Sequence, residues 1–510
     1  MKIVIVGGGS AGWMSAAAMC SMKQGHEVVV IESPNVPIMG VGESTINGFV
    51  SWLNSLGIDP EDFLADVDGS IKLAIHFKDF YKQGDDGFFY PFGIYAMNVD
   101  NFNAWNVRRV MAPELHKPLD ESFFPNMQLV KKNAFVKGVP FFPYTHFALH
   151  FDAVKFGMWL RDKFCKPKGV KHIQTEVTSV NTGEKGVESL VLANGETVTA
   201  DLYIDCTGYK SLLLGKALNV PFKSYSDTLP NNRAWATHMP YVDREKELNS
   251  YTDCTAIGNG WVWNIPLYSQ IGTGYVYSNE FVTDDEALAE FKAYIAKTGR
   301  DPETLKYKNL EVKSGIYDRV WEKNVVAIGL AAGFIEPLES TGLYTVHEFL
   351  GYLTQLLNRE VWNAYDIECF NGIALQIFDQ YAKFVALHYA FSTRRDTPYW
   401  RKIAETKYIK GDILTQKNDY FNETPMSRFQ RHFTDGLYPG INCVAAGMHM
   451  FYTDEWTIRT CTFPRTLDYR KAYGRDFMSL DEEVEKWKQA SEGAIPLTTY
   501  LDCVHGKKSE

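Results

Sequence analysis

At 510 residues the chain is too long for one ordinary domain and suits two or three. Its composition, 45% hydrophobic and 22% charged, is that of a globular protein. The net charge of -10 argues against nucleic acid or an anionic membrane as the main partner. The eight cysteines contain no C-x-x-C pair, so we expect reduced thiols and no metal site.

The N-terminal segment "KIVIVGGGSAGWMSAAAMCSM" predicts a buried strand, a glycine turn and a helix, and "HEVVVIES" predicts a second strand. Its apolar start is also typical of a signal peptide. The glycine cluster inside the apolar run favours the strand and turn instead, which predicts a cytoplasmic protein. No other segment is long and uncharged enough to predict a membrane span.

The turn after the first strand carries a G-x-G-x-x-G motif, formed by Gly7, Gly8, Gly9, Ser10, Ala11 and Gly12. Glycines there allow backbone N–H groups to approach a pyrophosphate at the N-terminus of the helix. Glu32 ends the second strand, where its carboxylate can accept a hydrogen bond from a ribose hydroxyl. We therefore predict a dinucleotide site; the alternative is a purely structural glycine turn.

Two later strand-to-glycine segments, "YIDCTGY" (203–209) and "AIGLAAGF" (327–334), favour FAD over NAD, because one NAD unit does not need them. Residues 350–400 have the aromatic-rich pattern of helices. The predicted fold is α/β, with a Rossmann-type FAD domain of the glutathione-reductase kind and an interleaved, mostly helical substrate-binding module. We place the flavin domain at 1–350, with a substrate-side insertion around 85–140, and the helical module at 351–510.

The segment "GWVWNIP" (260–266) contains Trp261 and Trp263 at a spacing that places both indoles on one face of a strand. Taken alone, this pattern is typical of core packing. Together with "GGGSAGWM", "MGVGEST", "ALHFDAVKF", "GTGYVYS", "AIGLAAGFIEPLESTGLY" and "HYAFSTRRDTPYW", however, the segment is similar to blocks of flavin-dependent halogenases of the tryptophan halogenase type. Phe334, Pro337, Ser340 and Gly342 also match the second motif of that family.

The resemblance implies that reduced FAD and O2 oxidise a bound halide to hypohalous acid, which crosses an internal tunnel to a lysine and then halogenates an aromatic carbon. By position the lysine is Lys72 and the assisting carboxylate is Glu339. Ser340 would link the flavin and substrate sites, and Thr341 and Gly342 would hold the halide through backbone N–H groups. Beyond the glycine motif and Glu32, the implied flavin contacts are Ser33, Val36, Ser44, Val177, Leu330 and Leu343. From its spacing alone, Lys72 reads as a surface lysine on a strand.

The substrate side departs from tryptophan halogenases. The segment "FFYPFG" keeps Phe92 of the aromatic cage but has Tyr90 where those enzymes have a histidine. Counted from Cys443, the positions of their remaining cage residues fall near Arg431, Asp435 and Gly436, so the stacking tryptophan is missing. We expect an electron-rich aromatic substrate other than free tryptophan; the sequence decides neither its identity nor the halide.

Two alternatives stay open, a flavin-dependent monooxygenase that hydroxylates aromatics and a flavin-binding protein without activity. The sequence has no recognisable nicotinamide site, so we expect a separate flavin reductase to supply FADH2. A homo-oligomer stays open. In the halogenase interpretation Trp261 and Trp263 line the tunnel and keep an organic substrate away from the flavin. His76, His347 and His388 are interpreted as core or surface residues.

Overall fold

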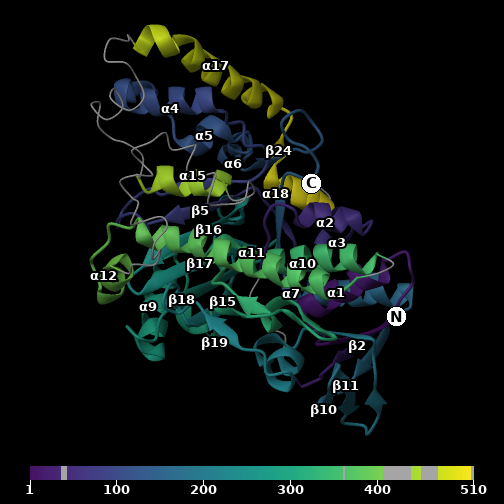
Figure 1. The fold of residues 1–510 in the computed structure, drawn as a ribbon. Helices are drawn as coiled ribbons and strands as arrows, with labels where there is room; N and C mark the ends of the chain where they lie inside the picture. The colour runs from purple at the N-terminus through teal and green to yellow at the C-terminus, as the bar shows by residue number, and fades with distance from the viewer. Residues whose placement is uncertain (36–42, 360–361, 406–437, 450–468, 507–510) are drawn as a thin grey trace.

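The structure is a computed structural model and describes residues 1–35, 43–359, 362–405, 438–449 and 469–506 (Figure 1). Val36 lies outside these residues, as do Arg431, Asp435 and Gly436.

The first sheet has the strand order β21-β22-β13-β1-β2-β9, and its strands run parallel except β21. At its centre, Ile3 to Ile5 are fully buried, as expected for a strand covered on both faces. Helix α1 (Ser10–Cys20) connects β1 to β2. The α/β class and the Rossmann-type opening unit are therefore confirmed. The strands are β1 (Lys2–Val6), β2 (Glu27–Glu32), β9 (Lys171–Gln174), β13 (Leu202–Asp205), β21 (Trp321–Glu322) and β22 (Val325–Ala327).

The second sheet is mostly antiparallel, in the order β19-β15-β18-β17-β16-β5-β6. Its one parallel pair joins β5 to β16, two strands far apart in the sequence, with Ala74 opposite Tyr251. The "GWVWNIP" segment is β17, at the middle of this sheet. The strands are β5 (Ala74–Lys78), β6 (Phe88–Pro91), β15 (Arg233–Met239), β16 (Tyr251–Ile257), β17 (Gly260–Pro266), β18 (Ile271–Tyr277) and β19 (Lys308–Glu311).

A small antiparallel sheet consists of β3 (Glu43–Ser44), β8 (Ala148–Phe151) and β4 (Ser70–Lys72). Its register places Ser44 and Ser70 opposite His150, and Lys72 opposite Ala148. Three further small sheets pair β10 (Val177–Gly183), β11 (Gly186–Leu192) and β12 (Thr197–Val198); β14 (Phe222–Ser224), β20 (Gly315–Tyr317) and β23 (Gly333–Phe334); and β7 (Ala134–Phe135) with β24 (Ile495–Pro496).

Two long helices, α10 (Gly342–Leu357) and α11 (Ala364–Ala390), cross the middle of the molecule (Figure 1). Helix α11 begins where Asn363 and Asp366 form a reciprocal capping box. The helices predicted from the aromatic pattern are thus present. Six other helices are α2 (Phe49–Ser55), α3 (Glu61–Leu64), α7 (Ala153–Trp159), α8 (Arg244–Glu247), α9 (Asp284–Lys297) and α12 (Pro398–Glu405).

The segment around 85–140 packs against the C-terminal part of the chain. Helix α17 (Tyr469–Ala490) lies beside α4 (Val99–Met111) at the top of Figure 1, and α15 (Tyr438–Gly447) packs on β6. Arg108 of α4 forms a bidentate ion pair with Asp481 of α17, 3.0 and 3.1 Å. The remaining helices here are α5 (Leu119–Phe123), α6 (Met127–Lys132) and α18 (Leu497–Val504). A division of the chain at residue 350 stays a prediction.

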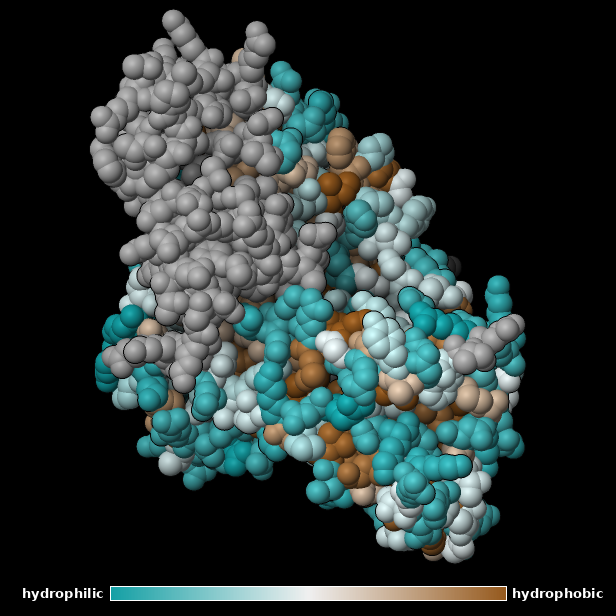
Figure 2. Space-filling view, in the orientation of Figure 1, coloured by the Kyte–Doolittle hydropathy of each residue, from teal (hydrophilic) through white to brown (hydrophobic). Residues whose placement is uncertain are grey.

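On the face drawn in Figure 2, apolar side chains show in small groups among polar ones. Large apolar side chains that are exposed, such as Val242, Tyr365 and Met478, come from distant elements. Within the described residues, no helix combines the length and the apolar character needed to cross a bilayer.

Candidate active site

The glycine turn between β1 and α1 is shaped by close backbone approaches. A Cβ atom on Gly12 would lie 1.9 Å from the carbonyl oxygen of Gly7, and one on Gly7, which has a φ of 116°, would lie 2.2 Å from that of Cys206. Both positions therefore require glycine. A Cβ atom on Gly9 would meet no atom within 4 Å, so the turn is open on that side. An open, amide-lined face at the start of a helix fits the pyrophosphate of FAD.

Glu32 packs directly against this turn, because a Cβ atom on Gly8 would lie 2.1 Å from its carboxyl carbon. Its Oε2 lies 2.8 Å from Nε2 of His172 on β9. Burial lowers the pKa of His172, although the charge of Glu32 opposes the shift. A neutral His172 that donates from Nε2 would orient the carboxylate. Nothing in the sequence around His172 indicated this pairing.

The other predicted flavin contacts come from distant parts of the chain. A Cβ atom on Gly329 would lie 2.8 Å from Cβ of Ala11, so the glycine turn that follows β22 and carries Leu330 reaches the start of α1. Leu343 is buried in the first turn of α10, Val177 begins β10, and Ser33 donates to Oε1 of Glu176, 3.1 Å.

Lys72 is fully buried at the end of β4, so its interpretation as a surface lysine is wrong. Its Nζ donates to the carbonyl oxygen of Thr45 and to Oγ of Ser340, 2.9 Å each, and lies 4.9 Å from the ring centroid of Phe92. Burial lowers the pKa of Lys72 to about 7, against the opposing influence of Cys254 and Glu339. At neutral pH a large share of this amine is therefore uncharged and nucleophilic.

A chain of buried hydrogen bonds continues from Lys72. Ser340 Oγ donates to Ser44 Oγ, 3.2 Å, and Ser44 Oγ lies 2.8 Å from Thr252 Oγ1. Ser340 adopts the left-handed backbone conformation, with φ 56°, immediately after the short turn at Pro337–Glu339. This conformation is costly for a non-glycine residue, and it places the side chain between Lys72 and Ser44.

His150 continues this series of hydrogen bonds on the other side of Thr252. Its Nε2 lies 2.8 Å from Thr252 Oγ1 and its Nδ1 lies 3.3 Å from Ser70 Oγ, which donates to the carbonyl oxygen of Pro266. Because Ser70 gives its only proton to Pro266, it accepts from Nδ1–H of His150. Burial, with the charge of Lys72, holds the pKa of His150 well below its usual value, so Nε2 of the neutral ring accepts from Thr252. Every hydrogen bond from Lys72 to Pro266 thus runs in one direction.

Glu339 is buried at the end of the turn at Pro337–Glu339, with Oε1 3.0 Å from Nε2 of His388 on α11. It lines a cavity of about 440 Å³. Burial raises the pKa of Glu339, whereas His388 and Lys72 oppose that shift. The cavity brings Tyr90 and Phe92 together with Glu339; it is lined by Ile46, Asn47, Gly48, Tyr90, Phe92, Glu339, Tyr344, Glu348, Tyr352, Ile373, Gln376, Ile377, Gln380, Tyr381 and Phe384.

Thr341 and Gly342 form the N-terminus of α10, where backbone N–H groups lack partners within the helix. Thr341 is buried, and a Cβ atom on Gly342 would meet nothing within 4 Å. The first turn carries no acidic residue. This open, uncompensated N-terminus fits a halide ion.

Trp261 and Trp263 are buried neighbours on β17, with ring centroids 6.1 Å apart. Trp261 Nε1 donates to Oε2 of Glu336, 3.2 Å, and the same oxygen accepts from Asn231 and Tyr389, 2.7 and 2.8 Å. These three hydrogen bonds to Glu336 hold the loop that leads to Glu339 and Ser340. Glu336 belongs to the "FIEPLEST" block, but its spacing gave no sign of these partners.

Comparison with known proteins agrees with this arrangement. The family pattern described as "Tryptophan halogenase" matches residues 2–460. The tryptophan 6-halogenase ThaL of Streptomyces albogriseolus is 32% identical over 479 residues, which cover 88% of this chain and 89% of that protein. The tryptophan 7-halogenase RebH of Lentzea aerocolonigenes is 33% identical over 437 residues, 82% of this chain and 81% of that protein.

Solved structures give the same result. The apo structure of VirX1 has a TM-score of 0.86 and 34% identity and covers 98% of both chains. The tryptophan 6-halogenase SttH of Streptomyces toxytricini has a TM-score of 0.85 and 26% identity over 99% of both chains. The resemblance seen in the sequence is confirmed. The chain belongs to the tryptophan halogenase family of flavin-dependent enzymes.

Proposed function

We propose that this enzyme halogenates an electron-rich aromatic compound with hypohalous acid that Lys72 delivers and Glu339 assists. The observation that carries the proposal is the fully buried Lys72, which is tied through Ser340 to Ser44 on one side and faces Phe92 of the cavity on the other. A buried amine with a pKa of about 7 is suited to hold an electrophile that would otherwise oxidise side chains at random.

The glycine turn, Glu32 and the other predicted flavin contacts would hold FAD, and Thr341 and Gly342 would hold the halide. With O2, reduced FAD supplies the oxidising power for the halide. Lys72 then binds the hypohalous acid by a hydrogen bond, or its uncharged amine takes the halogen. In the second case an N–halogen bond forms, the O–halogen bond breaks, and the hydroxyl group leaves with a proton of the amine as water. The aromatic carbon takes the halogen, and the carboxylate of Glu339 accepts the proton that this carbon loses.

We further propose that the substrate lacks a free carboxylate. Among the described residues that line the cavity, two are glutamates, Glu339 and Glu348, and none is lysine, arginine or histidine. Four tyrosines and three amide side chains supply hydrogen-bonding groups instead. Within the described part of the lining, the carboxylate of free tryptophan would lie beside these acids and meet no cationic side chain, which is unfavourable in a partly buried site. This supports the expectation that Tyr90, in place of a histidine, marks a different substrate.

The test is a matrix of indoles that share the reacting ring and differ in charge, each with chloride, bromide or iodide. Purified enzyme receives FADH2 and O2, and products are identified by mass spectrometry. We expect halide-dependent product from indole and tryptamine, and less from tryptophan and indole-3-propionate. Hydroxylated product without halide dependence would establish the monooxygenase instead, and FAD binding without any product would establish a flavin-binding protein.

We also propose that a separate flavin reductase supplies FADH2. With NADH, FAD, O2 and halide, the enzyme alone should give no product, and addition of a flavin reductase should restore it. Rapid oxidation of NADH by the purified enzyme would contradict this proposal.

A further inference from the structure

His388 occupies an apolar pocket directly beside Glu339. The side chain is fully buried on α11, and its ring lies against Phe77 at 4.6 Å, Phe384 at 5.8 Å and Phe80 at 6.0 Å between ring centroids. These rings offer no hydrogen-bond partner in the plane of the imidazole, so the ring nitrogens depend on the few oxygen atoms nearby.

Both ring nitrogens of His388 lie close to oxygen atoms. Nδ1 lies 3.3 Å from the carbonyl oxygens of Phe384 and Val385, one turn earlier in α11. Nε2 lies 3.0 Å from Oε1 of Glu339, an ion-pair distance at an angle bent away from a linear hydrogen bond. A neutral imidazole with its N–H on Nδ1 would need an O–H···N hydrogen bond from a protonated Glu339, and neither atom of this pair makes a hydrogen bond. The imidazolium cation has an N–H on each side and needs only the ion-pair distance to an ionised Glu339.

The charges around this pair favour the cation. An ionised Glu339 without a partner would be costly at this depth, and so would an isolated imidazolium, whereas the two together are neutral. Other ionisable groups that interact with the pair come from several elements; they are Lys72 on β4, Glu336 at the start of the turn, Tyr90 on β6, Cys254 on β16, Tyr381 on α11 and Cys443 on α15. Glu336 adds to the attraction for a cation at His388.

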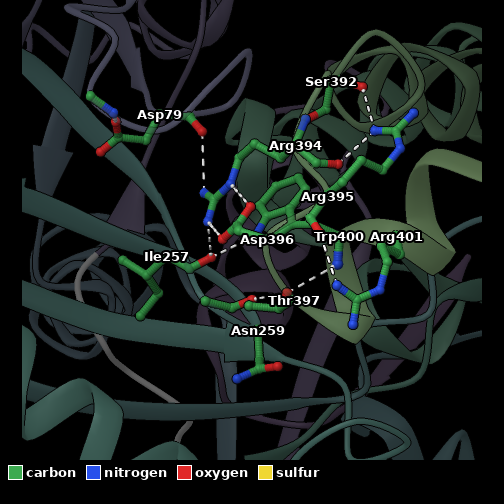
Figure 3. Close-up of polar contacts among 12 residues, drawn as sticks. Asp79, Ile257, Asn259, Ser392, Arg394, Arg395, Asp396, Thr397, Trp400 and Arg401 are labelled. Atoms are coloured by element: carbon green, nitrogen blue, oxygen red, sulfur yellow. Dashed lines mark hydrogen bonds and ion pairs between the residues drawn. The ribbon is translucent and has the colours of Figure 1, made fainter.

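The end of α11 that carries His388 is fixed by the block "STRRDTPYW" (Figure 3). Arg394 donates to the carbonyl oxygens of Asp79 and Ile257, 3.2 and 3.1 Å, and forms a bidentate pair with Asp396. Trp400 also donates to the carbonyl oxygen of Ile257, 2.7 Å. These contacts bind the helix end to β5 and β16, so the position of the imidazole relative to the cavity is set by rigid elements.

We propose that His388 is a positioning residue, held as an imidazolium, that keeps Glu339 ionised as the base for the substrate. The inference rests on the proposed halogenation. After the halogen–carbon bond has formed, the C–H bond of the same carbon breaks and its electron pair restores the aromatic ring. The proton moves to the carboxylate of Glu339. Without the cation beside it, burial would favour the protonated form of Glu339, which cannot accept this proton.

The charge state of the His388 ring can be measured without substrate turnover. In the full-length protein labelled with ¹⁵N-histidine, the His388 signals are assigned by their loss in His388→Gln. We expect both nitrogens to be protonated at neutral pH and Glu339→Gln to convert the ring to a neutral tautomer. A neutral imidazole in the parent protein would overturn the proposal, whatever the enzyme halogenates.

The role in proton transfer is tested with a substrate deuterated at the reacting carbon. In His388→Gln, whose side-chain amide can donate to Glu339 but carries no charge, we expect product formation to fall by about 100-fold or more. A primary isotope effect larger than that of the parent should accompany the fall, with FAD binding unchanged. His388→Phe, which keeps only the packing, should behave alike. A full rate without an increased isotope effect in His388→Gln would overturn the inference, whereas a parent enzyme that gives no halogenated product would contradict the proposed function instead.

Discussion

Lys72 Nζ lies 2.9 Å from Ser340 Oγ, although 268 residues separate the two in the chain. Lys72 ends a short strand near the N-terminus, and Ser340 precedes the helix at which we place the halide. One hydrogen bond therefore joins the expected sites of halide oxidation and substrate halogenation. The series of hydrogen bonds that continues from Ser340 through Ser44, Thr252 and His150 holds this contact in place.

Lys72→Ala should abolish halogenation and leave FAD binding intact, because the amine touches no residue of the glycine turn. Product is measured by mass spectrometry, FAD affinity by fluorescence quenching, and hydrogen peroxide by a peroxidase assay, which should show that O2 is still consumed. Lys155→Ala, at an exposed position on α7, is the control and should keep full activity. Full halogenation by Lys72→Ala would remove this residue from the mechanism.

Ser340→Ala should lower the rate on the order of tenfold, since one net hydrogen bond contributes about 1 to 1.5 kcal/mol. Lys72 keeps its bond to the carbonyl oxygen of Thr45, so part of its orientation survives. The exposed Ser224 on β14 provides a control for the same substitution. An unchanged rate in Ser340→Ala would show that Thr45 alone orients the amine.

Lys72→Met should stabilise the fold while it removes activity. Burial lowers the pKa of Lys72 from 10.5 to about 7, which corresponds to a destabilisation of at most about 5 kcal/mol. Between these two values the unfolded chain binds the extra proton, so the stability of the parent rises with pH. The advantage of the methionine variant is then largest at or below the folded pKa and fades towards the unfolded one. Urea unfolding at about pH 7 and about pH 10 measures the difference. An equal difference at both would contradict the lowered pKa.

The sequence predicts those helices and strands whose pattern lies in neighbouring residues. It does not predict contacts between segments that are far apart in the chain. The strand, glycine turn and helix around Gly7 to Gly12 can be recognised from a short run of adjacent residues. The aromatic-rich pattern that predicts α10 and α11 is equally local. The parallel pairing of β5 with β16 joins Ala74 to Tyr251 and leaves no periodicity to detect. For the same reason His388 is interpreted from the sequence as a core or surface residue and His150 is not singled out, because their partners, Glu339 and Thr252, lie in other blocks. The burial of Lys72 also depends on segments that cover β4 from elsewhere, so spacing alone suggested a surface residue.

Glycine variants should separate folding from FAD binding. Gly12→Ala places a Cβ atom 1.9 Å from the Gly7 carbonyl oxygen and should destabilise the protein. Gly9→Ala meets no protein atom within 4 Å, so it should fold but bind FAD more weakly, because the methyl group occupies the face where the pyrophosphate would lie. Thermal unfolding and FAD titration measure the two effects. Gly372→Ala, in an exposed helix interior with open space, should instead stabilise by about 0.5 to 1 kcal/mol. Undiminished FAD affinity in Gly9→Ala would place the pyrophosphate elsewhere.

Trp263→Ala should reveal whether the paired indoles act as a barrier. The Trp263 ring packs on Gly274, where a Cβ atom would lie 2.2 Å from it, and its Nε1 is buried without a partner among the described residues. The Trp263 side chain makes no hydrogen bond to a described residue, so the substitution removes apolar volume and should lower the free energy of unfolding by about 3 to 5 kcal/mol. Thermal unfolding and FAD titration must therefore show that the variant is folded. If the ring separates an organic substrate from the flavin, hydroxylated product should form alongside halogenated product. Trp261→Phe, which keeps volume but loses the hydrogen bond to Glu336, should give no hydroxylation. A folded Trp263→Ala variant with the parent's product profile would show that the indole contributes only packing.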